Sequence, residues 1–146
     1  MDDILWNIPE QKSGTVAIHG GNLHSFAPVA KTAEYFTKMP IKNIRTYLPN
    51  SLKSNIPSLP DIFFTKSTAT GSFDKSPELN AAVKDADITL LAGDFSKNSA
   101  TAVAIADALK NSESPTVWAK DTTDLLATEA QDLLPNGNIT LIATLS

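Results

Sequence analysis

Short apolar runs rich in β-branched residues alternate along this chain with segments of helical periodicity. This alternation is typical of parallel βα units, in which each strand is followed by a crossover helix. The run DITLLAG is apolar at both alternating sets of positions, as expected of a central strand buried on two faces. The pattern predicts six strands, at 15–20, 43–49, 61–66, 87–93, 115–120 and 139–144.

Four helices are expected between these strands. Ser25 can cap the first, which should end at Met39-Pro40, and Ser76 followed by a proline is a strong start for the second. The other two are expected at about 99–110 and 122–133. We therefore predict one α/β domain over 1–146, with a mainly parallel sheet flanked by helices on both faces in a Rossmann-like, three-layer arrangement.

Composition and charge exclude several classes of protein. The net charge of −4 and the scattered Lys and Arg residues lack the basic stripe of a nucleic-acid-binding surface. There is no cysteine, which rules out disulfides and thiolate chemistry. The acidic start MDDILWNIPEQKSG is unlike a signal peptide, and no apolar run approaches the length of a membrane span. We expect a cytoplasmic protein without nucleic-acid or membrane partners.

Candidate ligand-binding residues follow the predicted strands, because open α/β sheets bind ligands beyond the carboxyl ends of their strands. Adjacent glycines in GGN let a ligand approach the backbone closely, or else simply make a tight exit from the strand. The sequence is neither a Walker A loop nor the dinucleotide G-x-G-x-x-G. The candidates are Gly20, Gly21, Asn22, Gly93, Asp94 and Asp121, with Lys97, Lys120 and Thr122 in the same loops and Thr65, Lys66 and Ser67 in the loop after the third predicted strand.

Several of these side chains admit two interpretations. Asp94 and Asp121 follow central strands and could share a pocket as base or metal-site carboxylates, but helix N-capping explains each of them as well. His19 and His24 straddle the glycine turn without a third ligand at a recognisable spacing, which favours one half-buried and one exposed histidine over a metal pair. Trp118 is expected to pack in the core.

The order of these loops resembles a known family. The stretches KSGTVAIHGGN and APVAKTAEYF, and later DADITLLAGDFSKNSATAVAIADALK and PTVWAKDTTDLLA, resemble the ADP- or ATP-dependent NAD(P)H-hydrate dehydratases. The resemblance covers roughly residues 12–134. It implies a ribokinase-like fold and a lyase that repairs hydrated nicotinamide cofactors, using ATP or ADP with Mg²⁺ to phosphorylate the hydroxyl that then leaves.

The chain also departs from the family motifs. Ala92-Gly93-Asp94-Phe95-Ser96 stands where the family has Gly-Pro-Gly-Leu-Gly, and Asn22 replaces a serine. The family's Gly-x-Gly-Asp segment, with its catalytic Asp, would come after Ser146. The resemblance thus implies a nucleotide-binding role for Gly20, Gly21, Asn22, Gly93 and Asp121, and Asp94 remains a cofactor-binding candidate from its position after the strand. It assigns no catalytic residue and leads us to expect no turnover from this chain, as the front part of a longer ribokinase-like domain.

A second function remains open at this point: a non-catalytic protein that keeps the scaffold for small-molecule binding or assembly. The last predicted strand places Ile139, Leu141, Ala143 and Leu145 on one face. An uncovered apolar edge strand favours pairing with another chain, so we also expect a homo-oligomer.

Overall fold

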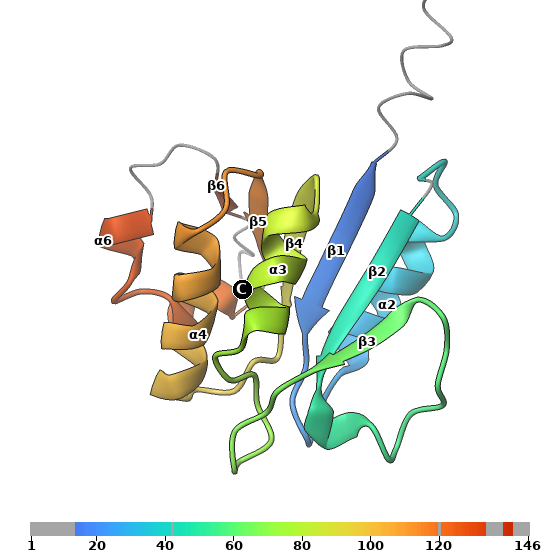
Figure 1. Ribbon diagram of the computed structural model, residues 1–146, viewed down its shortest axis with the longest axis horizontal. Coiled ribbons are helices and arrows are strands. Elements are labelled where there is room, and N and C mark those ends of the chain that lie inside the picture. Colours follow the sequence, from blue (N-terminus) through green and yellow to red (C-terminus); the bar gives the residue numbers. More distant parts are fainter. Residues whose placement is uncertain (1–13, 42, 120, 134–138, 142–146) are drawn as a thin grey trace, which may run out of the picture.

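A computed structural model describes residues 14–41, 43–119, 121–133 and 139–141 of this chain. Within them, six parallel strands form one sheet in the order β3-β2-β1-β4-β5-β6 (Figure 1). The β-branched, apolar composition of the runs identified in the sequence accounts for these strands. Their bounds are β1 (Thr15–Gly20), β2 (Asn43–Pro49), β3 (Ile62–Thr65), β4 (Ile88–Gly93), β5 (Thr116–Trp118) and β6 (Ile139–Leu141).

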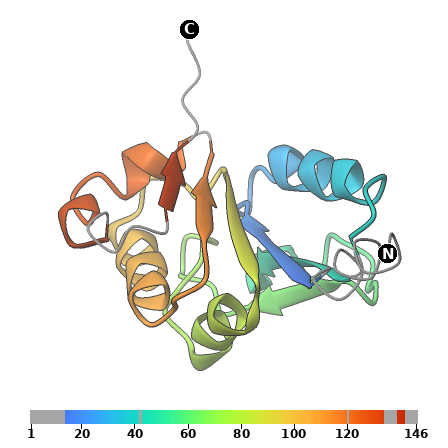
Figure 2. The same ribbon diagram turned by 90° about the horizontal axis from the view of Figure 1, so that it is seen from above.

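Helices cover both faces of the sheet. Figure 2 shows α2 (Ala27–Phe36) on one face and α3 (Pro77–Asp85) with α4 (Ser99–Lys110) on the other. Ser76 caps α3 by accepting the N–H of Leu79, as the Ser-Pro start predicts. Beyond β5 the chain forms the short helices α5 (Thr122–Leu125) and α6 (Ala130–Leu133). The predicted α/β fold, with a parallel sheet between two helical layers, is confirmed.

Two apolar cores follow from these layers. The larger lies between the sheet and α3 and α4, and it includes Phe73, Phe95 and Trp118, all fully buried. Trp118 is therefore a packing residue, as expected. The smaller core lies between the sheet and α2, around Ile18 and Val29.

One crossover lacks a helix. The chain between β2 and β3, residues 50–61, forms a single turn of 3₁₀ helix, η1 (Asn50–Leu52), and otherwise irregular backbone. Right-handed crossovers usually place a helix over the strands they connect. On the face that carries α2, the edge strands β2 and β3 therefore have less cover than the centre of the sheet.

Some expected bounds were wrong. The helix expected at about 122–133 is divided into α5 and α6, because Thr122, Thr123, Asp124 and Thr128 have low helix propensity and the segment instead turns to bury Leu126. Strands β3 and β5 are shorter than predicted. Position 120 and positions 142–146 lie outside the described residues, so the ends of the last two predicted strands are not described there.

Candidate functional site

The candidate site lies beside β1, where the order in which strands are added to the sheet reverses. Strand β1 is flanked by β2 on one side and by β4 on the other, and the chain connects to these neighbours over opposite faces of the sheet (Figure 2). This is the topological switch point at which open α/β folds bind ligands. The loops after β1 and β4 start there side by side, because Gly20 pairs with Gly93 across a shift in register.

Gly20, the last residue of β1, and Gly21, which follows it, each require glycine for a different structural reason. A methyl group on Gly20 would lie 2.5 Å from Cγ2 of Val29 and 2.6 Å from the carbonyl oxygen of Gly93, so this position needs the absence of a side chain. Gly21 has a φ of 89°, in the region that favours glycine. Its N–H donates to the carbonyl oxygen of Gly93 over 3.0 Å. Together they bring the helix α2 and the loop after β4 close to β1.

The loop Gly21–Ser25 uses its own backbone donors. The N–H of Asn22 donates to the Ser25 carbonyl, that of Leu23 donates to the Gly71 carbonyl, and that of His24 donates to Oδ1 of Asn22. A phosphate-binding loop instead directs free N–H groups at its ligand. Of the two interpretations of the double glycine, the geometry favours a tight, cross-linked strand exit that lines the site without cradling a phosphate.

Asp94 and Asp121 lie on loops that contact each other at this edge of the sheet. The backbone N–H of Asp94 donates to Oδ1 of Asp121 over 2.9 Å, and the Ser25 hydroxyl donates to Oδ2 of Asp94 over 2.5 Å. Asn22 joins them by donating its side-chain amide to the Asp94 carbonyl over 2.7 Å. All six candidate residues therefore belong to three loops that hydrogen bonds hold against one another.

Helix capping does not account for either carboxylate. Asp121 stands at the N-cap position of α5, but its side chain caps no backbone N–H there. The N-cap of α4 is Asn98, four residues after Asp94. Asp94 has a φ of 60° and Ser96 a φ of 62°, which is uncommon and strained for residues other than glycine. Such strain concentrates at ligand-binding loops.

A fourth loop, residues 67–73, joins the site, although the sequence pointed only to Ser67 within it. The Ser72 hydroxyl donates to the Phe95 carbonyl over 2.7 Å and lies 2.6 Å from the Ser96 hydroxyl. The Gly71 carbonyl accepts the N–H of Leu23, which joins this loop to the one after β1. The signal for it in the sequence was the Gly-Ser pair soon after β3, with Gly71 at a φ of 87°.

Ser25 was also assigned a different role. It was expected to cap the first helix, but α2 has Phe26 at its N-cap and no side-chain cap. The chain turns through a backbone bridge between Asn22 and Ser25. Because of that turn, the Ser25 hydroxyl donates to Asp94 instead of capping α2.

The remaining loop candidates contribute less. Lys66 pairs with Asp74 over 3.5 Å, Thr65 is buried, and the Thr122 hydroxyl donates to the Leu91 carbonyl. Lys97 is exposed. Lys120 lies outside the described residues. Within the described part of the chain there is no cluster of three His, Asp or Glu residues that could hold a metal ion.

His19 is a core residue immediately before the glycine turn. It is 1% exposed, and its ring stacks on Tyr47 with 4.6 Å between the ring centroids. Neither ring nitrogen has a hydrogen-bond partner among the described residues. Burial lowers the pKa of His19 to about 3, because the charged imidazolium would lose its hydration there. His19 is therefore neutral and was expected to be only half-buried, whereas His24 is exposed, as expected for one of the pair.

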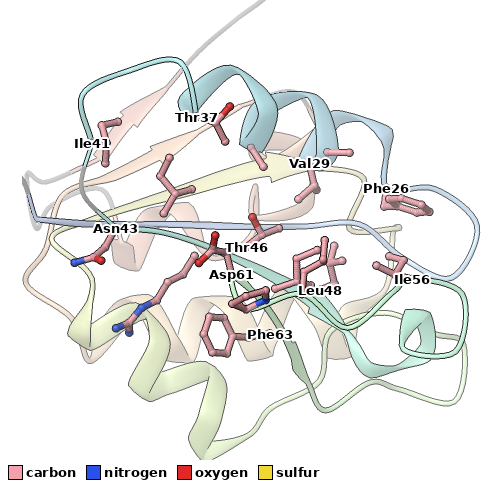
Figure 3. Close-up of a pocket in the computed structure, with 17 residues that line it drawn as sticks. Phe26, Val29, Thr37, Ile41, Asn43, Thr46, Leu48, Ile56, Asp61 and Phe63 are labelled. Atoms are coloured by element: carbon pink, nitrogen blue, oxygen red, sulfur yellow. The ribbon is translucent and has the colours of Figure 1, made fainter.

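A cavity lies beside the candidate site. It measures about 690 Å³ and lies between α2 and the strands β2 and β3 (Figure 3). Phe26 lines this cavity. Its Cβ is also the atom nearest to a Cβ placed on Gly21, at a distance of 3.1 Å. The cavity and the candidate site therefore adjoin at the start of α2.

Comparison with known proteins gives no relative that assigns a family. No family model, no curated protein and no solved structure matches this chain. In the described residues, no helix has both the length and the apolar character needed to cross a membrane.

Proposed function

We propose that this chain binds a nicotinamide or adenine nucleotide at the carboxyl ends of β1, β4 and β5, as a relative of the NAD(P)H-hydrate dehydratases. One observation carries this proposal: the hydrogen bond from the Asp94 N–H to Asp121, which joins two carboxylate-bearing loops at the switch point of the sheet. Nucleotides bind at this position in open α/β folds. The resemblance of the sequence to the dehydratases agrees with this class of ligand.

The polar groups of the site suit the ribose better than the phosphates. Carboxylates accept hydrogen bonds from hydroxyl groups, and an acidic residue on the ribose is a recurrent feature of dinucleotide binding. Asp94 and Asp121 supply these acceptors, whereas the backbone donors of the loop after β1 are already used. The phosphates would then extend toward exposed Lys97.

Magnesium fits this site as part of a nucleotide complex. Mg²⁺ prefers oxygen ligands and is commonly held by one or two carboxylates together with phosphate oxygens and water. Whichever of Asp94 and Asp121 the ribose does not use would hold it, and it would neutralise the phosphates of ATP or ADP. Since the described residues contain no third acidic or histidine ligand nearby, we propose that the ion arrives with the nucleotide.

In the dehydratases, a nucleotide phosphorylates the hydroxyl of the hydrated nicotinamide ring and phosphate then leaves. A carboxylate can act as the base in such a step, and an anion site at a helix N-terminus can stabilise the phosphoryl group. Here the glycine-rich motif of the family is replaced by Gly93-Asp94-Phe95-Ser96, in which Asp94 and Ser96 have a strained backbone conformation. We therefore propose nucleotide binding without dehydratase turnover, in the cytoplasm, where these nucleotides occur.

Isothermal titration of the 146-residue chain with NADH, NADPH, ADP and ATP, with and without Mg²⁺, tests this proposal. Binding of at least one nucleotide is expected, and Asp121→Ala should weaken it about tenfold or more by removing a charged acceptor. Asp124→Ala is the matched control, because Asp124 is an exposed carboxylate three residues further along the same loop and helix. An absence of binding up to millimolar concentrations would favour the alternative, a non-catalytic assembly protein.

A further inference from the structure

An apolar groove runs along the face of the sheet that carries α2. Its upper wall is α2, its floor is formed by β2 and β3, and one side is closed by the loop between those strands (Figure 3). Most of the lining is apolar, and Leu59 and Phe26 are exposed to solvent within it. We call this the α2 groove. It is lined by Phe26, Val29, Ala30, Ala33, Thr37, Ile41, Asn43, Ile44, Arg45, Thr46, Leu48, Ile56, Leu59, Pro60, Asp61, Ile62 and Phe63.

The α2 groove exists because one helix is missing from the layer. Strands of a parallel sheet need cover on both faces, which a crossover helix normally supplies. Residues 50–61 connect β2 to β3 with only η1, so the apolar side chains of Ile44 and Ile62 are left partly uncovered beside α2. A segment of extended or helical chain is the natural occupant of such a space.

We propose that the α2 groove is the docking site of residues 4–8 of the same chain. The segment MDDILWNIPEQKS, residues 1–13, lies outside the described residues, and its apolar side chains are Ile4, Leu5, Trp6 and Ile8. These are the side chains that a groove lined by Val29, Ile44 and Ile62 would bury. Burial of each large apolar side chain is favourable in proportion to the apolar area that it removes from water.

The position of β1 places this segment within reach. Thr15, the first residue of β1, lies in register beside Asn43, which lines the amino end of the groove. Trp6 is nine positions before Thr15, enough to span about 30 Å when extended. The groove follows α2, whose ten residues extend about 15 Å. A tether this short gives the segment a high effective concentration at the groove, which favours it over a second copy of the chain.

The fluorescence of Trp6 tests the docking directly. The chain has two tryptophans, and Trp118 is fully buried, so the difference between the spectra of wild type and Trp6→Phe isolates Trp6. We expect Trp6 to emit at shorter wavelength than in the free peptide MDDILWNIPEQK, and to be several-fold less accessible to acrylamide. Leu59→Asp should abolish both differences by placing a charge in the groove.

Val103→Asp is the matched control, because Val103 is 54% exposed on α4, away from the groove, and Leu59 is 52% exposed. Both variants should keep the wild-type far-ultraviolet circular dichroism. Peptide-like emission of Trp6 in the wild type, or an unchanged Trp6 signal in Leu59→Asp, would overturn the proposal. So would protection that disappears when dimers dissociate on dilution, which would assign the groove to a second copy. The test uses no nucleotide, so its outcome is independent of the proposed function.

Discussion

The backbone N–H of Asp94 donates to Oδ1 of Asp121 over 2.9 Å, joining the loop after β4 to the loop after β5. The two residues are 27 positions apart in the sequence. Asp94 adopts a left-handed backbone conformation at this contact. The Asp121 carboxylate therefore helps to hold the backbone of the loop after β4 in its strained conformation.

Removal of the Asp121 acceptor should destabilise the fold measurably. Asp121→Ala leaves the Asp94 N–H without this partner in a partly buried site, at an expected cost of about 1–3 kcal/mol in the free energy of unfolding. Asp121→Asn keeps a carbonyl oxygen at the same position and should retain most of that stability. Urea unfolding of the two variants measures the difference. Equal stability of Ala and Asn variants would show that the contact is not maintained in solution.

The close approach at Gly20 predicts a second loss of stability. Gly20→Ala would place a methyl group 2.5 Å from Val29 Cγ2 and 2.6 Å from the Gly93 carbonyl oxygen. Overpacking of this kind costs about 1–3 kcal/mol. In a double-mutant cycle, Val29→Ala should relieve part of that cost, because it removes one of the two contacts. Strictly additive effects would contradict the packing described at this strand exit.

His19 predicts a pH dependence of stability. Its pKa is about 3 in the folded protein and near 6.5 when unfolded, so between these values only the unfolded chain takes up the proton. Stability should therefore fall as the pH falls from about 6.5 toward 3, most steeply in the middle of that range, by about 1 kcal/mol per pH unit. Urea unfolding at several pH values measures this slope.

Two variants isolate the contribution of His19. His19→Phe keeps an aromatic ring against Tyr47 but cannot be protonated, so its stability should fall less steeply with decreasing pH. His24→Gln removes an exposed histidine and should keep the wild-type slope. Parallel slopes for wild type and His19→Phe would show that His19 does not titrate in this way.

The edge of the sheet at β6 leads us to propose self-association. Strand β6 is the last in the sheet order, and Leu141 within it is 46% exposed. Exposed apolar edge strands pair readily with other chains. Sedimentation velocity at micromolar concentrations should show a dimer that Leu141→Lys dissociates. A monomeric wild type at high concentration would contradict this expectation. The variant Ile142→Lys would test the same edge, but Ile142 lies outside the described residues.

The sequence predicted the positions of the helices and strands better than the contacts between them. The bounds of β2 and α4 follow from local patterns, since a β-branched run and an Ala-rich helical segment each specify their own structure. The helix expected at 122–133 failed where propensity was low and tertiary packing of Leu126 decided the path.

The candidate site was predicted in part for the same reason. The six loop residues could be placed at one edge of the sheet, because parallel strands share their carboxyl ends. Their contacts depend on strand order and loop shape, which single-sequence patterns do not contain. The bond from Ser25 to Asp94 and the contact between Ser72 and Ser96 were missed for that reason, as was the α2 groove.

Amide chemical-shift mapping tests the central proposal most directly. The ¹H–¹⁵N spectrum of the chain is titrated with NADH and with ADP, each in the presence of Mg²⁺. We expect saturable chemical-shift changes at Gly20, Gly21, Asn22, Gly93 and Asp121, and smaller changes in the Asp121→Ala variant. Shifts confined to 110–114, at the opposite edge of the sheet, or no shifts at millimolar nucleotide, would contradict it.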